Sequence, residues 1–356
     1  MATQDGEHGG GRPEVGVSVL TPTLNEEEHI VDTVRCLQAQ RLDAPVEFLF
    51  VDGRSEDATR ELLEGLAADD PRITVLDNPS RGIPFALNIG LRHARGEFVA
   101  RMDAHTLYPS DYLARGVERL RRGGVEWVSG PQLPHGEGRW SRRIALALET
   151  RLGIGGATFR DAIHEIEVDA GYTGVWRRET LVGQGGWDED WPINEDGELA
   201  ARIREAGGRI VCIPEMAALY VPRDSLGALA RQYLRYGTYR AKTCAAHPAS
   251  MRRSHVLPPA LVLTAAAGCL PAGRIRRPAR AGLAAYVLAL LATTAPRLRA
   301  SARDASFLPA VLATMHMSWG TGFWIGVRRF GPPIRALAML ARGALRGVRE
   351  RRPDDG

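Results

Sequence analysis

The chain has 356 residues, which is long enough for one large domain with an appendage or for two domains. Its 46 basic and 42 acidic residues leave a net charge of only +4, so bulk charge gives no reason to expect nucleic acid as a partner. The four cysteines have no paired spacing, which argues against a zinc knuckle or a disulfide framework and favours a reducing cytosol.

Residues 1–14 are polar and glycine-rich and do not have the pattern of a secretory signal, so we expect a disordered leader. From residue 15 onward, short β-rich runs alternate with helical patterns. We expect strands at 17–21, 46–51, 73–76 and 97–102, and helices at 26–40, 56–68 and 84–94. This alternation predicts an α/β fold with a mainly parallel sheet. Glu26 to Glu28 would complement the dipole in a first helical turn, and Ser55 would be an N-cap.

The regular alternation stops after residue 128. Residues 132–168 have mixed helix and loop character, with glycines at 153, 155 and 156, and we expect a mobile loop over the substrates. Order then resumes with a short strand near 172–176, a helix at 195–206 that a glycine pair ends, and a strand at 209–213. An amphipathic helix from residue 225 to about 242 closes a domain that we place at residues 15–250.

Beyond Arg253 the chain consists of apolar runs separated by arginine-rich gaps. Runs without Asp, Glu, Lys or Arg cover residues 254–273, 281–296 and 305–327. A spanning helix needs roughly 17–25 apolar residues, so the third run is a good candidate, while prolines and glycines weaken the first and the second is short.

We therefore expect apolar membrane-associated helices at residues 251–330 and a basic tail at 331–356, at the face of an anionic membrane. A buried helical hairpin domain is the alternative. Because arginines fill both gaps between the runs, the positive-inside rule does not decide the topology, and one run could be re-entrant or interfacial.

Polar residues follow three of the predicted strands. Asn25 and Glu26 follow the first, Asp52 ends the second, and Asp103 ends the strand at 97–102. In an open α/β sheet the ligand lies beyond the carboxyl ends of the strands, where a carboxylate can accept hydrogen bonds from a base or ribose. Asp52 is the better nucleoside ligand, with capping of the turn at Gly53 as its alternative role. Asn25 and Glu26 could instead only start a helix.

Asp103 and His105 form a candidate metal site. An acidic residue at the end of a buried strand, with a second ligand two residues on, can hold a divalent cation against a diphosphate. Mg²⁺ or Mn²⁺ would stabilise charge on a departing nucleoside diphosphate. The alternative for Asp103 is a turn that closes the strand.

The predicted helix at 195–206 carries a candidate base. Attack on an anomeric carbon needs a base, preferably a carboxylate whose pKa is perturbed, and Asp196 lies beside Glu195 at this helix start. An acidic first turn on a solvated helix is the alternative. On the later amphipathic helix, Gln232, Arg235 and Tyr236 share one face, where arginine can clamp phosphate and tyrosine can stack on a sugar. Taken singly, that face is an ordinary amphipathic one.

The order of these motifs resembles family 2 glycosyltransferases of the GT-A fold. The resemblance covers about residues 15–250 and rests on TPTLNE at 21–26, VDGRSED at 51–57, NP at 78–79, ALNIG at 86–90, RMDAH at 101–105, ED at 195–196 and QYLRYG at 232–237. It implies an inverting transfer from a nucleotide diphosphate sugar, with a UDP-sugar as the first expectation. The acceptor would be a hydroxyl of a polyprenyl-diphosphate-linked sugar or glycan in exopolysaccharide or cell-surface glycan synthesis.

The resemblance also implies roles for individual residues. Asp52 would bind the nucleoside, Asp103 the metal, and Asp196 would be the base. The remaining donor-site residues would be Pro22, Thr23, Asn25, Glu26, Arg81 and Asn88, and those near the donor phosphates and acceptor would be Glu195, Gln232, Arg235 and Tyr236. Two departures stand out. His105 replaces the second Asp of many members, and Tyr236 replaces the tryptophan of processive polymer synthases, which argues against a long polymer channel.

Two other functions stay open: a catalytically inactive, sugar-nucleotide-binding membrane assembly protein, and a sugar nucleotidyltransferase. Retention of Asp103 and Asp196 argues against the first. The second would show a Gly-rich loop with Arg and Lys after the first strand, where this chain has residues 22–26, PTLNE. We expect the enzyme at a cell inner membrane or plasma membrane, with its catalytic domain in the cytoplasm.

Overall fold

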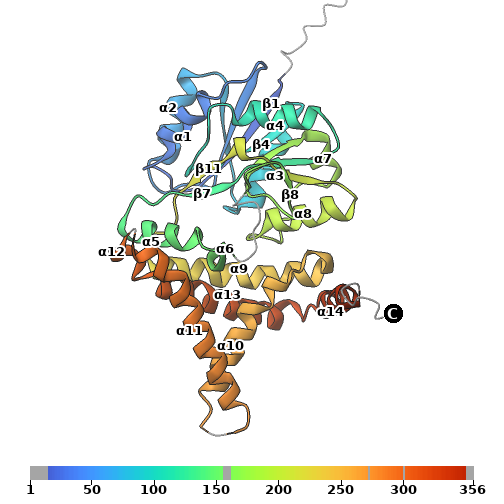
Figure 1. The fold of residues 1–356 in the computed structure, drawn as a ribbon. Helices are drawn as coiled ribbons and strands as arrows, with labels where there is room; N and C mark the ends of the chain where they lie inside the picture. Colours follow the sequence, from blue (N-terminus) through green and yellow to red (C-terminus); the bar gives the residue numbers. More distant parts are fainter. Residues whose placement is uncertain (1–14, 155–161, 272, 300, 350–356) are drawn as a thin grey trace, which may run out of the picture.

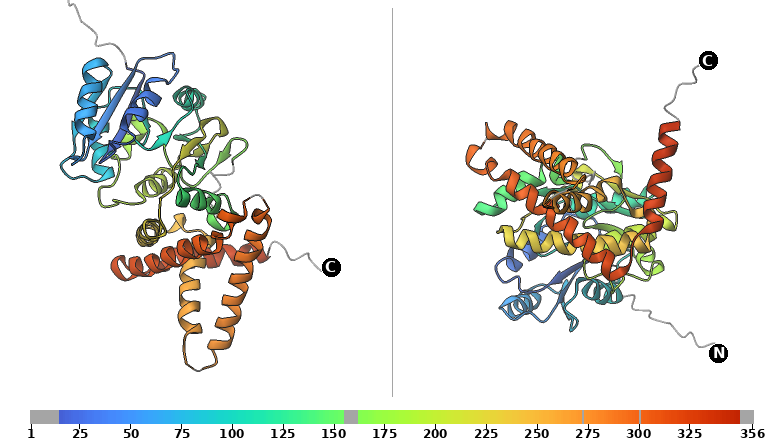
Figure 2. Two further views of the ribbon diagram at one scale, coloured as in Figure 1. Left: turned by 90° about the vertical axis from the view of Figure 1, so that its left-hand side faces the viewer. Right: turned by 90° about the horizontal axis from the view of Figure 1, so that it is seen from below.

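The computed structural model describes residues 15–154, 162–271, 273–299 and 301–349. An α/β layer of sheet and helices lies on one side of the molecule, long helices run beneath it, and a helical hairpin projects away from both (Figures 1 and 2). The expected leader at 1–14 lies outside the described residues.

The central sheet has eight strands in the order β3-β2-β1-β4-β9-β6-β10-β8. They are β1 (Val17–Thr23), β2 (Val46–Asp52), β3 (Ile73–Asp77), β4 (Phe98–Arg101), β6 (Trp127–Ser129), β8 (Ile166–Glu167), β9 (Gly174–Arg177) and β10 (Ile210–Cys212). The pairs β1–β2, β2–β3, β1–β4 and β6–β10 are parallel, whereas β9 is antiparallel to β4 and β6. The predicted mainly parallel sheet is confirmed, and its strand order reverses between β1 and β4, where ligands bind in open α/β sheets.

Helices cover both faces because side chains on a strand alternate between them. On β1, Val17 and Val19 belong to the core under one face and Leu20 to the core under the other. The first core includes α1 (Ile30–Gln38), α2 (Thr59–Asp69) and α4 (Tyr112–Arg121), and the second includes α3 (Ile83–His93), α7 (Arg178–Gly183) and α8 (Glu195–Glu205).

The segment at 132–168 contains more regular structure than its sequence indicates. It holds β7 (Gln132–Pro134), α5 (Arg139–Leu148), α6 (Arg151–Ile154) and β8. The strand β7 forms a second sheet with β5 (Thr106–Leu107) and β11 (Ala218–Tyr220). Residues 155–161, where we expected part of a mobile loop, lie outside the described residues.

Two predicted helix starts are wrong. The first helix begins at Ile30, not at Glu26, because the backbone N–H groups of Glu26 and its neighbours donate to side chains of the loop after β2 and of Thr59 at the start of α2. Ser55 is not an N-cap. Its hydroxyl donates to Asp52, and α2 begins only at Thr59. Both loops therefore hold each other in place at the edge of the sheet where the site lies.

The C-terminal region contains α9 (Leu226–Ala246), α10 (Leu257–Gly268), α11 (Arg276–Leu298), α12 (Ala302–Ala305), α13 (Leu308–Phe330) and α14 (Ile334–Arg349). Helix α14 lies where we expected only a basic tail. Ser225 caps α9 by accepting a hydrogen bond from the Ala228 N–H at 3.3 Å. Helices α9 and α13 lie along each other beneath the sheet (Figure 1).

The expectation that the third apolar run is a good candidate for a spanning helix is wrong. That run forms α13, which packs closely against α9. A Cβ atom added to Gly322 of α13 would collide with the Leu234 carbonyl of α9, and a Cβ atom added to Gly237 of α9 would collide with the Trp319 carbonyl of α13. Within the described part of the chain, α11, from the second run, is the one helix long and apolar enough to cross a membrane. Hydropathy alone does not separate a helix that packs on protein from one that faces lipid.

Candidate active site

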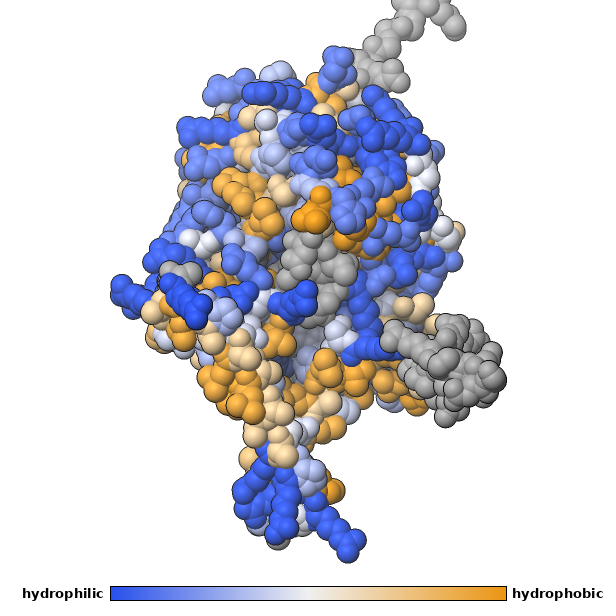
Figure 3. Space-filling model, viewed as in Figure 1, coloured by the Kyte–Doolittle hydropathy of each residue, from blue (hydrophilic) through white to orange (hydrophobic). Residues whose placement is uncertain are grey.

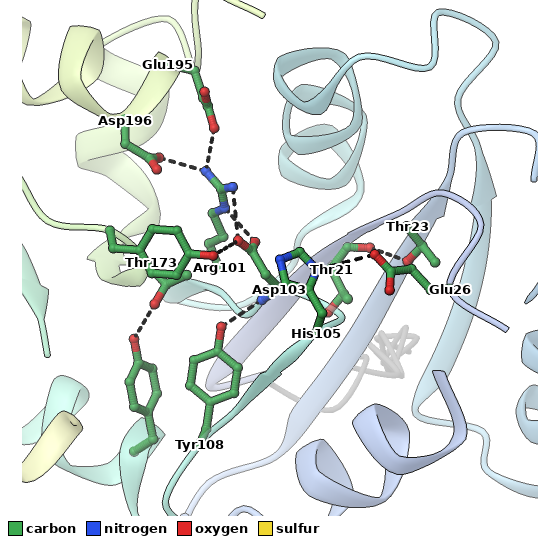
Figure 4. A network of polar contacts seen from close by, with 12 residues as sticks. Thr21, Thr23, Glu26, Arg101, Asp103, His105, Tyr108, Thr173, Glu195 and Asp196 are labelled. Carbon is green, nitrogen blue, oxygen red and sulfur yellow. Dashed lines mark hydrogen bonds and ion pairs between the residues drawn. The ribbon is translucent and has the colours of Figure 1, made fainter. Parts of the chain in front are cut away.

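The candidate site lies where the carboxyl ends of β1 and β4 meet the start of α8, at the reversal of strand order (Figure 4). Arg101 is the last residue of β4, and its side chain is only 3% exposed. A buried guanidinium requires acidic partners. The structure supplies them from the β4–β5 turn and from the first turn of α8.

Arg101 lies between three carboxylates. Its Nε is 2.7 Å from Asp103 Oδ1, and its Nη1 is 2.9 Å from Glu195 Oε1 and 2.8 Å from Asp196 Oδ1. These carboxylates are themselves only 8–14% exposed. With all groups ionised the cluster carries a net charge of −2, which one divalent cation would neutralise.

The two key carboxylates have pKa values that are pushed apart. Burial raises the pKa of Asp196 well above its ordinary value, although the charge of Arg101 opposes that shift. Burial also acts to raise the pKa of Asp103, but the charge and hydrogen bonds of Arg101 outweigh it and hold the value below the usual range. Such a divergence is typical of carboxylates with different roles in one site. Asp103 stays ionised, as a cation ligand must, and Asp196 can exchange a proton.

Tyrosines fix the position of Asp103. The Tyr172 hydroxyl donates to Asp103 Oδ2 at 2.9 Å, and the Asp103 backbone N–H donates to the Tyr108 hydroxyl oxygen at 2.7 Å. From the sequence we predicted no role for these tyrosines or for Arg101. An arginine at the end of an apolar strand run was a signal for a buried ion pair. Tyr172 gave no such signal, because it lies far from Asp103 in the sequence.

His105 lies at the mouth of this cluster. Its Nδ1 is 3.3 Å from Glu26 Oε1, and the side chain is 41% exposed. Burial acts to lower the pKa of His105, but the hydrogen bond to Glu26 and the charge of Asp103 outweigh it and raise that pKa. A histidine must lose its proton to bind a metal, so binding at His105 would release one.

The residues fit a cation that takes most of its ligands from a substrate. Among the described residues, no group of three or more His, Cys, Asp or Glu side chains could hold a metal ion by itself. Magnesium-type ions are commonly bound by one or two carboxylates together with substrate phosphates. Thr21 Oγ1, at the carboxyl end of β1, is buried and has no hydrogen-bond partner among the described residues, so a polar group is free there for a ligand.

Asp52 is fully buried, and its carboxylate holds the turn after β2. Its Oδ1 accepts the Ser55 hydroxyl at 2.6 Å, and Arg60 Nη1 lies 3.6 Å from Oδ2. This is the turn-capping role that we considered as the alternative, and nucleoside binding by Asp52 stays a prediction. Asn25 has a φ of 54° and accepts the Glu56 N–H at 2.8 Å, which joins the loops after β1 and β2.

The other predicted donor residues already have partners in the fold. Pro22 and Thr23 end β1, and the Thr23 hydroxyl donates to the Thr21 carbonyl at 3.1 Å. Arg81 pairs with Glu56 at 2.7 Å. Asn88 bridges α3 to the loop before α8, because its amide both donates to and accepts from the backbone of Trp187, and it also donates to Glu189. Their donor contacts remain predictions.

The predicted α9 face reaches the site through a tyrosine. Gln232 Nε2 donates to the Tyr236 hydroxyl at 2.8 Å and to the Tyr220 hydroxyl at 3.4 Å. The Tyr220 ring centroid lies 6.5 Å from that of His105. The structure thus connects Gln232 and Tyr236 to the Asp103 cluster, while Arg235 is exposed to solvent.

Comparison with known proteins decides the family. Residues 18–180 match the family model described as "Glycosyl transferase family 2". Over 309 residues the chain is 31% identical to the succinoglycan biosynthesis protein ExoA of Rhizobium meliloti, covering 86% of this chain and 93% of that protein. The chain belongs to glycosyltransferase family 2.

One further relative of this family 2 glycosyltransferase and one solved structure are informative. An undecaprenyl-phosphate 4-deoxy-4-formamido-L-arabinose transferase of Pseudomonas fluorescens is 31% identical over 145 residues, which is 39% of this chain and 42% of that protein. A mannosyltransferase of Pyrobaculum calidifontis, solved with GDP-Man and Mn²⁺, superposes with a TM-score of 0.56 at 24% identity, covering 88% of each chain. This likeness supports the predicted GT-A fold.

Proposed function

We propose that this family 2 glycosyltransferase moves a sugar, with inversion, from a nucleotide diphosphate sugar to a hydroxyl of a polyprenyl-diphosphate-linked acceptor. The reaction would serve exopolysaccharide or cell-surface glycan synthesis. The observation that carries the proposal is the buried cluster of Asp103, Arg101 and Asp196 at the switch point of the sheet. It combines a carboxylate kept ionised with one suited to proton transfer.

Asp103, together with His105, would hold Mg²⁺ or Mn²⁺ through the donor diphosphate. When bound, the cation neutralises the charge that develops on the departing nucleoside diphosphate. Arg101 keeps Asp103 ionised, and Tyr172 keeps one of its oxygens oriented. We expect UDP-sugars to be donors, with Asp52 and the loops after β1 and β2 around the nucleoside.

Asp196 would be the general base. Its Oδ1 is engaged by Arg101, which leaves Oδ2 for the proton of the acceptor hydroxyl. As the acceptor oxygen forms its bond to the anomeric carbon, the bond to the diphosphate breaks on the opposite face, so one displacement inverts the configuration. An inactive binding protein would have no use for a buried carboxylate whose pKa is raised, which favours catalysis over that alternative.

The acceptor would lie at a membrane surface. One relative is named for succinoglycan biosynthesis and another for transfer to undecaprenyl phosphate. In addition, the hairpin of α10 and α11 exposes large apolar side chains. We propose that the enzyme lies at the inner or plasma membrane, with its catalytic domain in the cytoplasm. An enzyme on the bilayer encounters a polyprenyl-linked acceptor by diffusion in the membrane plane. A soluble acceptor would give no reason for the enzyme to be attached to a membrane.

The test is transfer of label in membranes that contain the protein. Membranes would be offered a panel of radiolabelled nucleotide sugars and then extracted with organic solvent, with membranes carrying Asp196→Asn as the matched control. We expect label in the lipid fraction for one donor and none with the variant. Label only in water-soluble sugars or in protein would contradict the lipid-linked acceptor, and no transfer from any donor would contradict the activity.

A further inference from the structure

The Thr243 hydroxyl of α9 holds the loop that leads into α8. The Thr243 side chain is fully buried. Its Oγ1 accepts hydrogen bonds from Trp191 Nε1 at 2.9 Å and from Asn194 Nδ2 at 2.9 Å, and it donates to the Tyr239 carbonyl at 3.1 Å. A hydroxyl has one donor and two acceptor positions, so these three contacts use its capacity completely. Thr243 therefore fixes two side chains of the loop, one at each end of residues 191–194.

Asn194 has an unusual conformation for the residue that precedes a helix. It occupies the N-cap position of α8 with a φ of 66°, in the left-handed region. An N-cap asparagine ordinarily has an extended backbone, and its side chain accepts a hydrogen bond from the first turn of its helix. Asn194 makes no such bond, and its amide donates to Thr243 instead. Left-handed residues other than glycine persist where the surrounding contacts determine them, and they cluster at active sites.

Gly197 leaves the space in which the Asn194 amide lies. A Cβ atom added to Gly197 would come within 2.7 Å of both Nδ2 and Oδ1 of Asn194, so a larger residue there would push the amide aside. Asp196 lies between these two residues in the chain, and its Oδ1 is 2.8 Å from Arg101 Nη1 (Figure 4). The backbone that the contact between Asn194 and Thr243 fixes is therefore the backbone that aims the proposed base.

Other contacts from α9 hold the start of this loop and the far end of α8. Lys242 Nζ donates to the Asp190 carbonyl at 2.8 Å and lies 3.5 Å from the centre of the Trp191 ring, which is a cation–π contact. At the end of α8, Glu205 Oε2 lies 2.9 Å from His247 Nδ1. These contacts do not involve the threonine hydroxyl. Loss of that hydroxyl should therefore loosen the first turn of α8 while the rest of the helix stays in place.

Helix α9 also contacts the acceptor side of the site and the helices beneath the sheet. Its Gln232 donates to the Tyr236 hydroxyl beside the site, and α9 packs along α13. Trp324 Nε1 of α13 in turn donates to the Pro259 carbonyl of α10 at 3.0 Å. The hairpin that α10 begins has an exposed apolar shaft, which Figure 3 shows. One helix thus orders the loop before the base and packs on the layer that carries the proposed membrane surface.

We propose that Thr243 is a positioning residue for the base: through Asn194 it sets the left-handed turn that aims the Asp196 carboxylate at the acceptor hydroxyl. This inference rests on the proposed role of Asp196 and goes beyond it by assigning what orients that carboxylate. Because Thr243 is fully buried beneath the loop, its loss should slow the chemical step without weakening donor binding. A displacement of about 1 Å at a reacting group can lower the rate by about 100-fold.

The test compares variants of two threonines on α9. Thr243→Val keeps the shape of the side chain and removes the hydroxyl, whereas Thr243→Ser keeps the hydroxyl. Thr238→Val is the matched control, because among the described residues the buried Thr238 hydroxyl bonds only to the Leu234 carbonyl of its own helix, at 2.8 Å. Initial rates of label transfer in membranes would be measured over a range of donor concentrations.

The expected signature is a change in kcat alone. We expect kcat to fall by about 10- to 100-fold in Thr243→Val, while KM for the donor changes by less than about threefold. Thr243→Ser and Thr238→Val should keep both constants within about threefold of the wild type, since the first retains the hydroxyl and the second leaves the loop untouched. A residue that only stabilised the fold would not separate kcat from KM in this way.

Asn194→Gly removes the same contact from the other side. Glycine adopts a φ of 66° without strain, so this variant isolates the loss of the amide, and it decides the question by itself if Thr243→Val does not fold. We expect a similar fall in kcat, and the double variant should be no more than about twofold slower than either single variant, because both changes remove one interaction.

Three results would overturn the inference: a wild-type kcat in folded Thr243→Val or in Asn194→Gly, an equal fall in Thr243→Ser or Thr238→Val, or effects that multiply in the double variant. Normal turnover of Asp196→Asn would instead contradict the proposed base itself. The failure of this inference and the failure of the proposed function are therefore distinguishable.

Discussion

Replacing Arg101 by glutamine removes the single cation of the buried cluster while keeping most of its length. The net charge of the cluster would change from −2 to −3 with all groups ionised. Removing one partner of a buried ion pair typically costs about 3–5 kcal/mol, because the remaining charges stay buried without compensation. Burial already raises the pKa of Asp196, so in the variant this carboxylate can take up a proton. Proton uptake removes one buried negative charge and therefore sets an upper limit to the loss of stability.

For a domain of this size, such a loss lowers the melting temperature by about 6–20 °C. Thermal unfolding of the detergent-solubilised protein, followed by tryptophan fluorescence, measures the shift. Mn²⁺ with UDP should raise the melting temperature more for Arg101→Gln than for the wild type, because the added cation compensates a larger negative charge. Arg60→Gln is a matched control: Arg60 is 40% exposed and lies 3.6 Å from Asp52, so its loss should cost about 0–1 kcal/mol.

A shift for Arg101→Gln as small as that of the control would refute the view that Arg101 is the essential counter-charge. The same conclusion would follow if Mn²⁺ and UDP stabilised wild type and variant equally, since the excess negative charge would then have no effect on cation binding.

Three further predictions concern single groups. Asp196→Asn should abolish transfer and leave donor binding, measured by calorimetry, nearly unchanged; normal turnover would remove Asp196 from the role of base. Asp103→Ala, or excess chelator on the wild type, should abolish transfer, and full activity in either case would exclude the metal. The hydrogen bond to Glu198 raises the pKa of His247 in the folded protein. Protonated His247 therefore stabilises the fold fully below about pH 6.5, and this contribution is lost as the pH rises through the pKa of the folded state. His247→Gln should therefore lower the free energy of unfolding by about 1–3 kcal/mol at pH 6 and by less at pH 9; an equal loss at both would contradict the ion pair.

The sequence by itself determined the fold class and the outline of the site. Alternating β-rich and helical runs predict a parallel sheet, and such sheets bring the ends of their strands to one edge, so Asp103 had to lie at the ligand-binding edge. The placement of Asp196 at a helix start followed from local signals as well. These features are local in the chain, and local patterns are what a sequence displays directly.

Tertiary structure alone decided the details on which chemistry depends. The pairing of Arg101 with Asp196 and of Tyr172 with Asp103 joins residues far apart in the chain, and no periodicity encodes such contacts. The start of α1 at Ile30 was set by hydrogen bonds that the backbone after β1 donates to the loop after β2 and to Thr59, and these outcompete the local preference of an acidic run for a first helical turn. Tertiary structure also decided that α13 packs along α9, because burial is a property of neighbours; α11 is the one described helix long and apolar enough to cross a membrane.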